Sequence, residues 1–202
     1  MKNLKELLEE LKSEGIRDPR IFKAFEKYPR ELFVGKDVKQ FSYSNSPLPI
    51  GYSQTISQPY IVAYMTEKLD IDENDKILEI GTGSGFQTAI LSCLAKEVFT
   101  VERIKELYEL ARKRFEELKI KNVRVKLGDG KEGWEEYSPY DKIIVTAAAK
   151  EMPKKLLKQL RKNGIAIAPV GDYIQYLYIY RKNDKDRIEK IRDIAVSFVP
   201  LV

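Results

Sequence analysis

The spacing of apolar residues along the first seventy positions predicts three helices. Leucines three and four residues apart indicate a helix over residues 4–11. Asp18 followed by Pro19 is typical of a helix start, so a second helix is expected to about residue 28. A third is expected over 59–69.

From residue 76 onward, short apolar strands alternate with amphipathic helices. The expected strands are 77–80, 97–101, 123–127, 142–145, 165–170, 174–181 and 188–199. The expected helices are 86–95, 104–118 and 154–160, the last with a C-cap at Asn163-Gly164. This alternation predicts an α/β fold with a doubly wound, mostly parallel sheet and helices on both faces. The consecutive strands at the end of the chain predict an antiparallel closing hairpin.

Residues 35–58 interrupt these patterns with a stretch rich in Ser, Pro, Gly, Asn and Gln. A loop of this length in a compact domain usually has a function. The chain shows no internal repeat and no low-complexity linker. We therefore expect one domain over 1–202, with helices and the polar loop in 1–70 and an α/β core with the last strands in 71–202.

Composition limits the available chemistry. The 202 residues include no histidine and one cysteine, Cys93, which argues against the usual zinc sites and against Ser-His or Cys-His catalysis. Without an internal disulfide, a cytoplasmic location is expected. The net charge of +5 arises from Lys and Arg interleaved with Glu, so we expect a solvated surface and not a nucleic-acid site. No segment resembles a signal peptide or a membrane span.

The most distinctive local sequence is Gly81-Thr82-Gly83-Ser84-Gly85, which lies between a predicted strand and a predicted helix. Glycines there let a ligand approach the backbone, and the helix start offers free amide groups. Phe86 stands where the dinucleotide fingerprint has its third glycine, so that motif is absent. A tight turn without a ligand is the alternative for a glycine loop considered alone.

Two acidic residues follow the next two predicted strands. Glu102 ends the strand after the glycine loop, where a carboxylate can accept hydrogen bonds from both hydroxyls of a ribose. Asp129 stands between Gly128 and Gly130 after the next strand, where it can accept from an adenine amino group. The carboxyl ends of parallel strands meet at one edge of a sheet. Three suitable groups at successive strand ends therefore favour a nucleoside site over chance.

With these residues in view, the chain resembles the class I S-adenosylmethionine methyltransferases, and among them the protein-L-isoaspartate (D-aspartate) O-methyltransferases. The general resemblance rests on residues 78–85, 101–102 and 128–130. The specific one rests on Gly51-Tyr52-Ser53-Gln54-Thr55-Ile56-Ser57-Gln58-Pro59, Pro29-Arg30-Glu31-Leu32-Phe33-Val34 and Phe198-Val199-Pro200-Leu201. The resemblance covers nearly the whole chain. It implies a Rossmann-like fold, S-adenosyl-L-methionine as cofactor with no metal, and peptide or protein substrates that contain L-isoaspartate.

The resemblance also implies roles for individual residues. Ser57 matches the active-site serine. The loop that covers the cofactor is matched by Ile50, Gly51, Tyr52 and Ser53, and the cofactor-binding positions by Glu79, Gly81, Gly83, Glu102, Asp129 and Gly130. Gln58 and Tyr60 replace an alanine and a histidine of some members, so no role of that histidine transfers. Val202 ends the chain where some members continue with a polar residue.

This chemistry suits a chain without histidine. A carboxylate acceptor has a pKa near 4, so it is already an ionised nucleophile at neutral pH. A sulfonium donor has a neutral leaving group, and no general base is needed. The protein must align the reactants and exclude water. We expect Ser57 to orient the carboxylate; the alternative is that it caps the helix expected from residue 59.

Two other functions remain open on the sequence. One is a methyltransferase acting on RNA or a small molecule, although Thr146-Ala147-Ala148-Ala149 stands where base-amino methyltransferases carry Asn/Asp-Pro-Pro-aromatic. The other is a non-catalytic nucleotide-binding or protein-interaction module, which the cofactor positions and Ser57 disfavour. Tyr176, Tyr178 and Tyr180 can offer a strand edge or an aromatic surface to an extended peptide, with cross-strand packing as the alternative.

Overall fold

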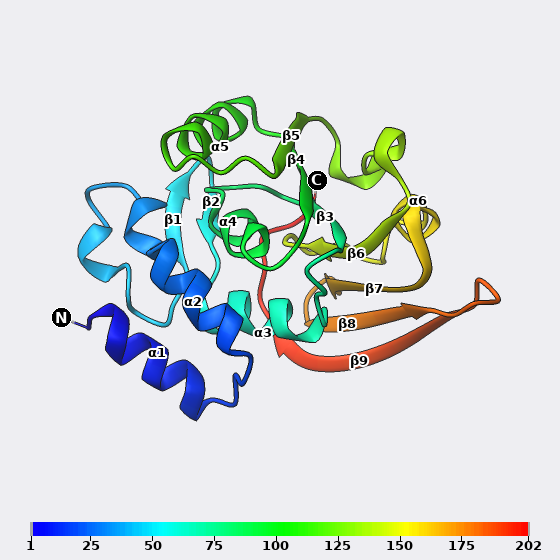
Figure 1. The fold of residues 1–202 in the computed structure, drawn as a ribbon, viewed down its shortest axis with the longest axis horizontal. Coiled ribbons are helices and arrows are strands. Elements are labelled where there is room, and N and C mark those ends of the chain that lie inside the picture. Colours follow the sequence, from blue (N-terminus) through cyan, green and yellow to red (C-terminus); the bar gives the residue numbers. More distant parts are fainter. Residues whose placement is uncertain (1, 202) are drawn as a thin grey trace.

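The computed structural model describes residues 2–201, and within them one sheet of seven strands organises the chain (Figure 1). The strand order is β5–β4–β3–β6–β7–β8–β9. The strands are β3 (Lys76–Ile80), β4 (Glu97–Glu102), β5 (Val123–Leu127), β6 (Tyr140–Val145), β7 (Leu160–Val170), β8 (Gln175–Lys182) and β9 (Ile188–Val196). Pairing is parallel from β5 to β7 and antiparallel from β7 to β9. The predicted doubly wound sheet with an antiparallel end is confirmed.

Helices cover both faces of this sheet. They are α1 (Leu4–Ser13), α2 (Pro19–Lys27), α3 (Pro59–Lys68), α4 (Phe86–Ser92), α5 (Lys105–Glu117) and α6 (Lys154–Gln159), with short 3-10 turns η1 (Arg30–Leu32), η2 (Lys39–Phe41), η3 (Gly130–Glu132) and η4 (Glu135–Tyr137). The predicted cap of α2 is confirmed, because the Asp18 carboxylate accepts from the Arg20 amide at 2.8 Å. None of the described helices is long and apolar enough to cross a membrane.

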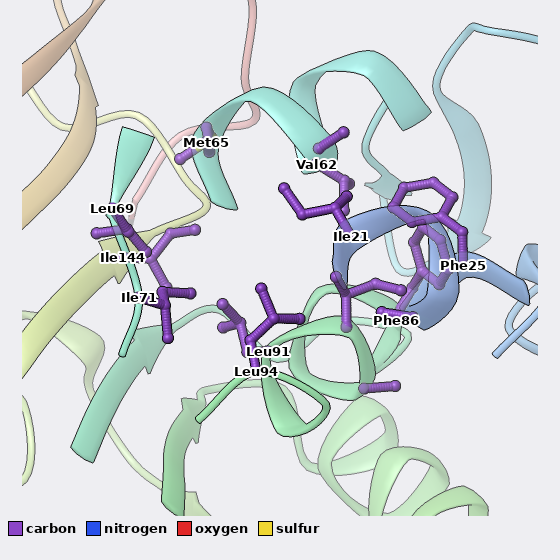
Figure 2. Packing of buried hydrophobic residues seen from close by; sticks show 14 of the residues in the cluster. Ile21, Phe25, Val62, Met65, Leu69, Ile71, Phe86, Leu91, Leu94 and Ile144 are labelled. Carbon is purple, nitrogen blue, oxygen red and sulfur yellow. The ribbon is translucent and has the colours of Figure 1, made fainter. Parts of the chain in front are cut away.

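The hydrophobic core has two parts, one on each face of the sheet. On one face, α2, α3 and α4 pack together and against the strands, as Figure 2 shows with Phe25 of α2, Met65 of α3, Phe86 of α4 and Ile144 of β6. The other core lies between the sheet, α6 and the η4 region. Each strand of the centre is therefore apolar on both sides, which explains the short continuous apolar runs in the sequence.

The sheet reverses its winding between β3 and β6. From β3 the chain proceeds through α4 and α5 toward β5, and from β6 it proceeds through α6 toward β7. In open α/β sheets, ligands bind at the carboxyl ends of the strands beside such a reversal. The fold thus places the glycine loop after β3 at the expected ligand position.

Two sequence predictions on local structure are wrong. The loop over 35–58 contains a hairpin, β1 (Leu48–Gly51) and β2 (Gln54–Ile56), paired antiparallel. The helix α6 ends at Gln159 without a cap at Asn163-Gly164, because Leu160 already has an extended backbone and pairs with Tyr140 of β6. Glycine is still required at 164, since an added Cβ would lie 2.8 Å from the Asp141 carbonyl oxygen.

One carboxyl group is sealed inside the sheet. Glu79 of β3 is 0% exposed, and its neighbour in register on β4 is Thr100. Its Oε2 accepts from the Thr88 hydroxyl of α4, whereas its Oε1 has no hydrogen-bond partner. Burial raises the pKa of Glu79 to about 8, against an ordinary value of 4.5. The protonated acid is therefore the form held at neutral pH.

This pKa predicts that the Glu79→Gln variant gains stability over the parent as the pH rises from 5 to 8. In that window the unfolded parent ionises Glu79 while the folded parent keeps it protonated, so the parent loses stability; above pH 8 the loss levels off. The gain should reach on the order of 2–4 kcal/mol. Urea unfolding at several pH values measures it, and no histidine titration overlaps the window. A difference that is constant from pH 5 to 8 would contradict the assignment.

Candidate active site

A cavity opens at the carboxyl ends of β3, β4 and β6. It holds about 850 Å³ of space between protein atoms, including its opening to solvent. Three helices contribute Val62 of α3, Phe86 and Gln87 of α4 and Leu107 of α5 to its lining. The rest of the lining comes from the hairpin and the residue after it (50, 54–57), the glycine loop (80–84), the end of β4 and the residues after it (101–104), Gly130, the residues after β6 (146–147) and the last described residues (199–201).

The glycine loop adopts a backbone that only glycine tolerates well. Gly81, Gly83 and Gly85 have φ angles of 94°, 53° and 86°. An added Cβ at Gly81 would lie 2.5 Å from the Thr146 hydroxyl, and one at Gly85 would lie 2.8 Å from the Phe115 ring. Gly83 instead faces the cavity. Packing therefore requires glycine at 81 and 85, while Gly83 leaves room for a ligand between the loop and the hairpin.

Glu102 links the glycine loop to the end of β4. Its Oε2 accepts from the Gly83 amide at 2.8 Å, and its Oε1 accepts from the amides of Arg103 and Ile104 at 2.8 and 2.9 Å. The side chain is buried but lines the cavity. A carboxylate has about four acceptor positions. One position on Oε2 therefore remains for a ligand hydroxyl.

The two site residues predicted after β5, Asp129 and Gly130, take different positions relative to the cavity. Gly130 lines the cavity and packs directly on Ile80, which leaves no room for a side chain. Asp129 is exposed, and its carboxylate accepts from the Lys131 amide at 2.8 Å at the start of η3. The structure brings Gly130 into the cavity wall and leaves Asp129 at its margin.

The hairpin β1–β2 forms the wall opposite the glycine loop. Ile50 lines the cavity, and its Cδ1 would be 3.4 Å from a Cβ placed on Gly83. The turn residues Gly51, Tyr52 and Ser53 all have positive φ angles and lie outside the cavity lining. The Tyr52 side chain is 54% exposed. The hairpin thus presents the apolar residues Ile50 and Ile56 to the cavity and the Tyr52 ring to solvent.

Ser57 follows the hairpin and lines the cavity. The N-cap residue of α3 is Gln58, with no side-chain cap bond. The alternative interpretation of Ser57 as a helix cap is therefore wrong, because the helix begins one residue later than that role requires. The hydroxyl is left available to the cavity.

Glu79 lies behind the wall of the cavity. It is absent from the lining, and the Thr82 and Thr100 hydroxyls, 2.7 Å apart, lie between the buried strand and the loop. Thr82 lines the cavity. The Glu79 carboxyl group instead accepts a hydrogen bond from Thr88 of α4.

Sequence reasoning missed residues that only tertiary structure brings to the site. Thr146 lines the cavity, and its hydroxyl lies 2.9 Å from the Ile80 carbonyl oxygen and 2.7 Å from that of Gly81. Val199, Pro200 and Leu201 line it as well, because the chain end pairs with Ala148. No local pattern identifies these positions. Val202 lies outside the described residues.

The three tyrosines of β8 do not offer a free strand edge, because β8 pairs with β7 on one side and β9 on the other. Lys190 lies 4.1 Å from the ring centre of Tyr178, and Arg192 lies 5.0 Å from that of Tyr176. Tyr180 is buried. These three rings therefore take part in packing between neighbouring strands, which was the alternative to a peptide-binding surface.

The residues present fit an adenosyl sulfonium cofactor. Glu102 offers an acceptor for hydroxyl groups, Gly83 and Gly130 allow close approach of the backbone, and apolar side chains such as Ile104 and Leu107 can flank a base. Among residues 2–201 no group of three or more His, Cys, Asp or Glu residues is placed to hold a metal ion.

Comparison with known proteins agrees with this fit. The family model for protein-L-isoaspartate(D-aspartate) O-methyltransferases matches residues 2–202. A protein-L-isoaspartate O-methyltransferase of Dictyoglomus thermophilum is 54% identical over 199 residues, which are 98% of this chain and 90% of that protein. One from Yersinia pestis is 48% identical and covers 100% of this chain and 96% of its own.

Solved structures give the same result. A putative protein-L-isoaspartate O-methyltransferase from Plasmodium falciparum in complex with S-adenosyl-L-homocysteine has a TM-score of 0.87, with 28% identity over 100% of this chain and 99% of that one. A second protein-L-isoaspartate O-methyltransferase has a TM-score of 0.90 at 30% identity; the match covers 98% of this chain and 65% of that one. The chain therefore belongs to the protein-L-isoaspartate(D-aspartate) O-methyltransferase family and is an S-adenosylmethionine-dependent methyltransferase.

Proposed function

We propose that this chain methylates the α-carboxyl group of L-isoaspartyl residues in peptides and damaged proteins, and that the cavity described above is where the transfer occurs. The supporting observation is that one cavity joins Ser57, the glycine loop and Glu102 in a chain that matches the family over its whole length. The bound cofactor supplies a methyl group on a positively charged sulfur, which a carboxylate can attack without a base.

In this proposal the two walls of the cavity have different roles, one in binding the cofactor and the other in binding the acceptor. On one wall, Gly83 and Glu102 bind the nucleoside through the loop backbone and the free acceptor position of the carboxylate. On the other wall, the Ser57 hydroxyl donates a hydrogen bond to the acceptor carboxylate and orients it. Ile50 excludes water between the two. Alignment of the reactants supplies most of the rate enhancement that this reaction needs.

Asp129 and the hairpin turn have supporting roles in this proposal. Asp129 lies at the cavity margin, where it can accept a hydrogen bond from the base amino group. The turn at 51–53 covers the opening and faces the polypeptide substrate. The functional units correspond to 1–70, which carries the acceptor wall, and 71–202, which carries the cofactor wall. The single cysteine supports a cytoplasmic location for the enzyme.

Methyl transfer to matched peptides tests the proposed acceptor. A peptide with one L-isoaspartyl residue should be methylated, and its L-aspartyl twin should not, because its carboxylate is displaced by one methylene and a misplacement of about 1 Å costs on the order of a hundredfold in rate. Radiolabelled donor and release of volatile methanol at mild alkaline pH measure the ester. Equal labelling of both peptides, or base-stable label on RNA, would contradict the proposed acceptor and leave family membership unchanged.

The Glu102→Ala variant tests the nucleoside contact. We expect affinity for S-adenosylhomocysteine to fall by about 1.5–3 kcal/mol, since a hydrogen bond to a charged group is lost. Isothermal titration calorimetry measures it. Glu97→Ala is the matched control, because Glu97 lies at the opposite end of β4 beside Arg124. Equal affinities in a folded Glu102→Ala variant and its parent would remove Glu102 from the site.

The Ser57→Ala variant tests the acceptor contact. We expect kcat with an isoaspartyl peptide to fall about 10–100-fold, as expected for loss of a positioning hydrogen bond, with little change in S-adenosylhomocysteine affinity or thermal stability. Ser92→Ala is the control, since that hydroxyl bonds the Ala89 carbonyl outside the cavity. Parental turnover in Ser57→Ala would show that the hydroxyl does not act on the substrate.

A further inference from the structure

Arg30 is a charged residue buried without an ion-pair partner. Its side chain is 1% exposed, and no carboxylate among residues 2–201 lies within salt-bridge distance of it. Burial lowers the pKa of Arg30 to about 10, so the guanidinium still carries its charge at neutral pH. A buried, unpaired charge is costly, and an apolar residue of similar volume would fill the space at lower cost. The residue therefore does more than fill space.

The two terminal nitrogens of the guanidinium, Nη1 and Nη2, donate only to backbone carbonyl oxygens of two segments, whereas the buried Nε has no hydrogen-bond partner. Nη1 donates to Ser42 at 3.0 Å and Nη2 donates to Ser46 at 2.9 Å, both in the loop before the hairpin. Nη2 also donates to the Ser57 carbonyl oxygen at 3.0 Å. Longer bonds reach Ser44 and Ile56 at 3.3 and 3.4 Å. One planar group thus fastens both ends of the hairpin.

The segment that carries Arg30 is itself fixed against the cofactor wall. Arg30 begins η1, and Phe33, just after it, packs against Phe86 with ring centres 5.3 Å apart. Phe86 is the first residue of α4, directly after the glycine loop, and it lines the cavity. Arg114 lies over Phe33 and donates to the Ser84 carbonyl oxygen. Residues 30–33 therefore bridge the acceptor wall and the cofactor wall.

We propose that Arg30 is a positioning residue, whose guanidinium holds the Ser57 backbone so that the hydroxyl meets the acceptor carboxylate in line with the cofactor loop. This inference rests on the role proposed above for Ser57. It gives the segment Pro29-Arg30-Glu31-Leu32-Phe33-Val34 a function that the cavity lining alone does not show. Lysine cannot replace arginine here, because a single ammonium lacks the fork that spans two segments.

The Arg30→Lys variant, alone and combined with Ser57→Ala, tests this proposal. Arg30→Lys should lower kcat for an isoaspartyl peptide about 10–100-fold, the loss that accompanies a shift near 1 Å. Affinity for S-adenosylhomocysteine should stay near that of the parent. In the Ser57→Ala background, Arg30→Lys should have little further effect on kcat, because the hydroxyl that it positions is already gone.

Arg20→Lys is the matched control, since Arg20 also donates to a backbone carbonyl, that of Ile71 at 2.9 Å, but lies outside the cavity. Its kcat should equal that of the parent. Rates are expressed per folded molecule from circular dichroism, and Arg30→Gln serves as a second variant where Arg30→Lys is poorly folded.

Parental kcat per folded molecule in both Arg30 variants would overturn the proposal. A loss in Arg30→Lys that multiplies with that of Ser57→Ala would also overturn it, because Arg30 would then act independently of the serine. If Ser57→Ala alone keeps the parental kcat, the proposed role of Ser57 fails, and the inference for Arg30 fails with it. Retained preference for isoaspartyl over aspartyl peptides in all variants separates these results from a failure of the proposed reaction.

Discussion

The three hydrogen bonds accepted by the Glu102 carboxylate hold the site together. They join the amide of Gly83, in the loop after β3, to the amides that begin the turn after β4. This link acts together with the bond from the Thr146 hydroxyl to the Gly81 carbonyl oxygen and with the Thr82–Thr100 hydroxyl pair in holding the glycine loop at the edge of the sheet. The same carboxylate keeps one acceptor position toward the cavity. In this proposal a single group therefore shapes the loop and recognises the ligand.

The site works with backbone groups and one hydroxyl in place of an imidazole. Because the acceptor carboxylate is already ionised, the enzyme must align the two reactants and exclude water, and it needs no proton transfer. The two walls of the cavity come from segments far apart in sequence, the 50–57 region and the loops after β3 and β4. Alignment across such a gap requires a rigid connection. The segment from Arg30 to Phe33, whose first and last residues are buried, supplies one, through carbonyl oxygens on one side and aromatic packing on the other.

Local patterns predicted the elements of this fold well where the residues themselves determine the structure. The alternating strands and helices after residue 76, the cap at Asp18 and the cavity position of Glu102 all depend on neighbours in sequence or on strand ends. The hairpin at 48–56 and the early end of α6 depend on pairing with distant partners.

The same limit applies to the site. Thr146 and the chain end enter the cavity through contacts with Ile80 and Ala148, which no local pattern encodes. Arg30 is a similar case. Its motif was visible as part of a family resemblance, but its buried geometry became visible only with the fold. The roles of all the site residues as ligand contacts remain predictions, and among them Glu79, Asp129 and the hairpin turn do not line the cavity.

The central claim is that donor and acceptor meet between the glycine loop and Ser57. A crystal structure with both S-adenosylhomocysteine and an isoaspartyl peptide tests it most directly. We expect a ribose hydroxyl on Glu102, the sulfur beside the glycine loop, and the free α-carboxylate within hydrogen-bonding distance of the Ser57 hydroxyl, in line with the sulfur. A peptide carboxylate bound away from Ser57, or a nucleoside bound outside the cavity, would contradict it.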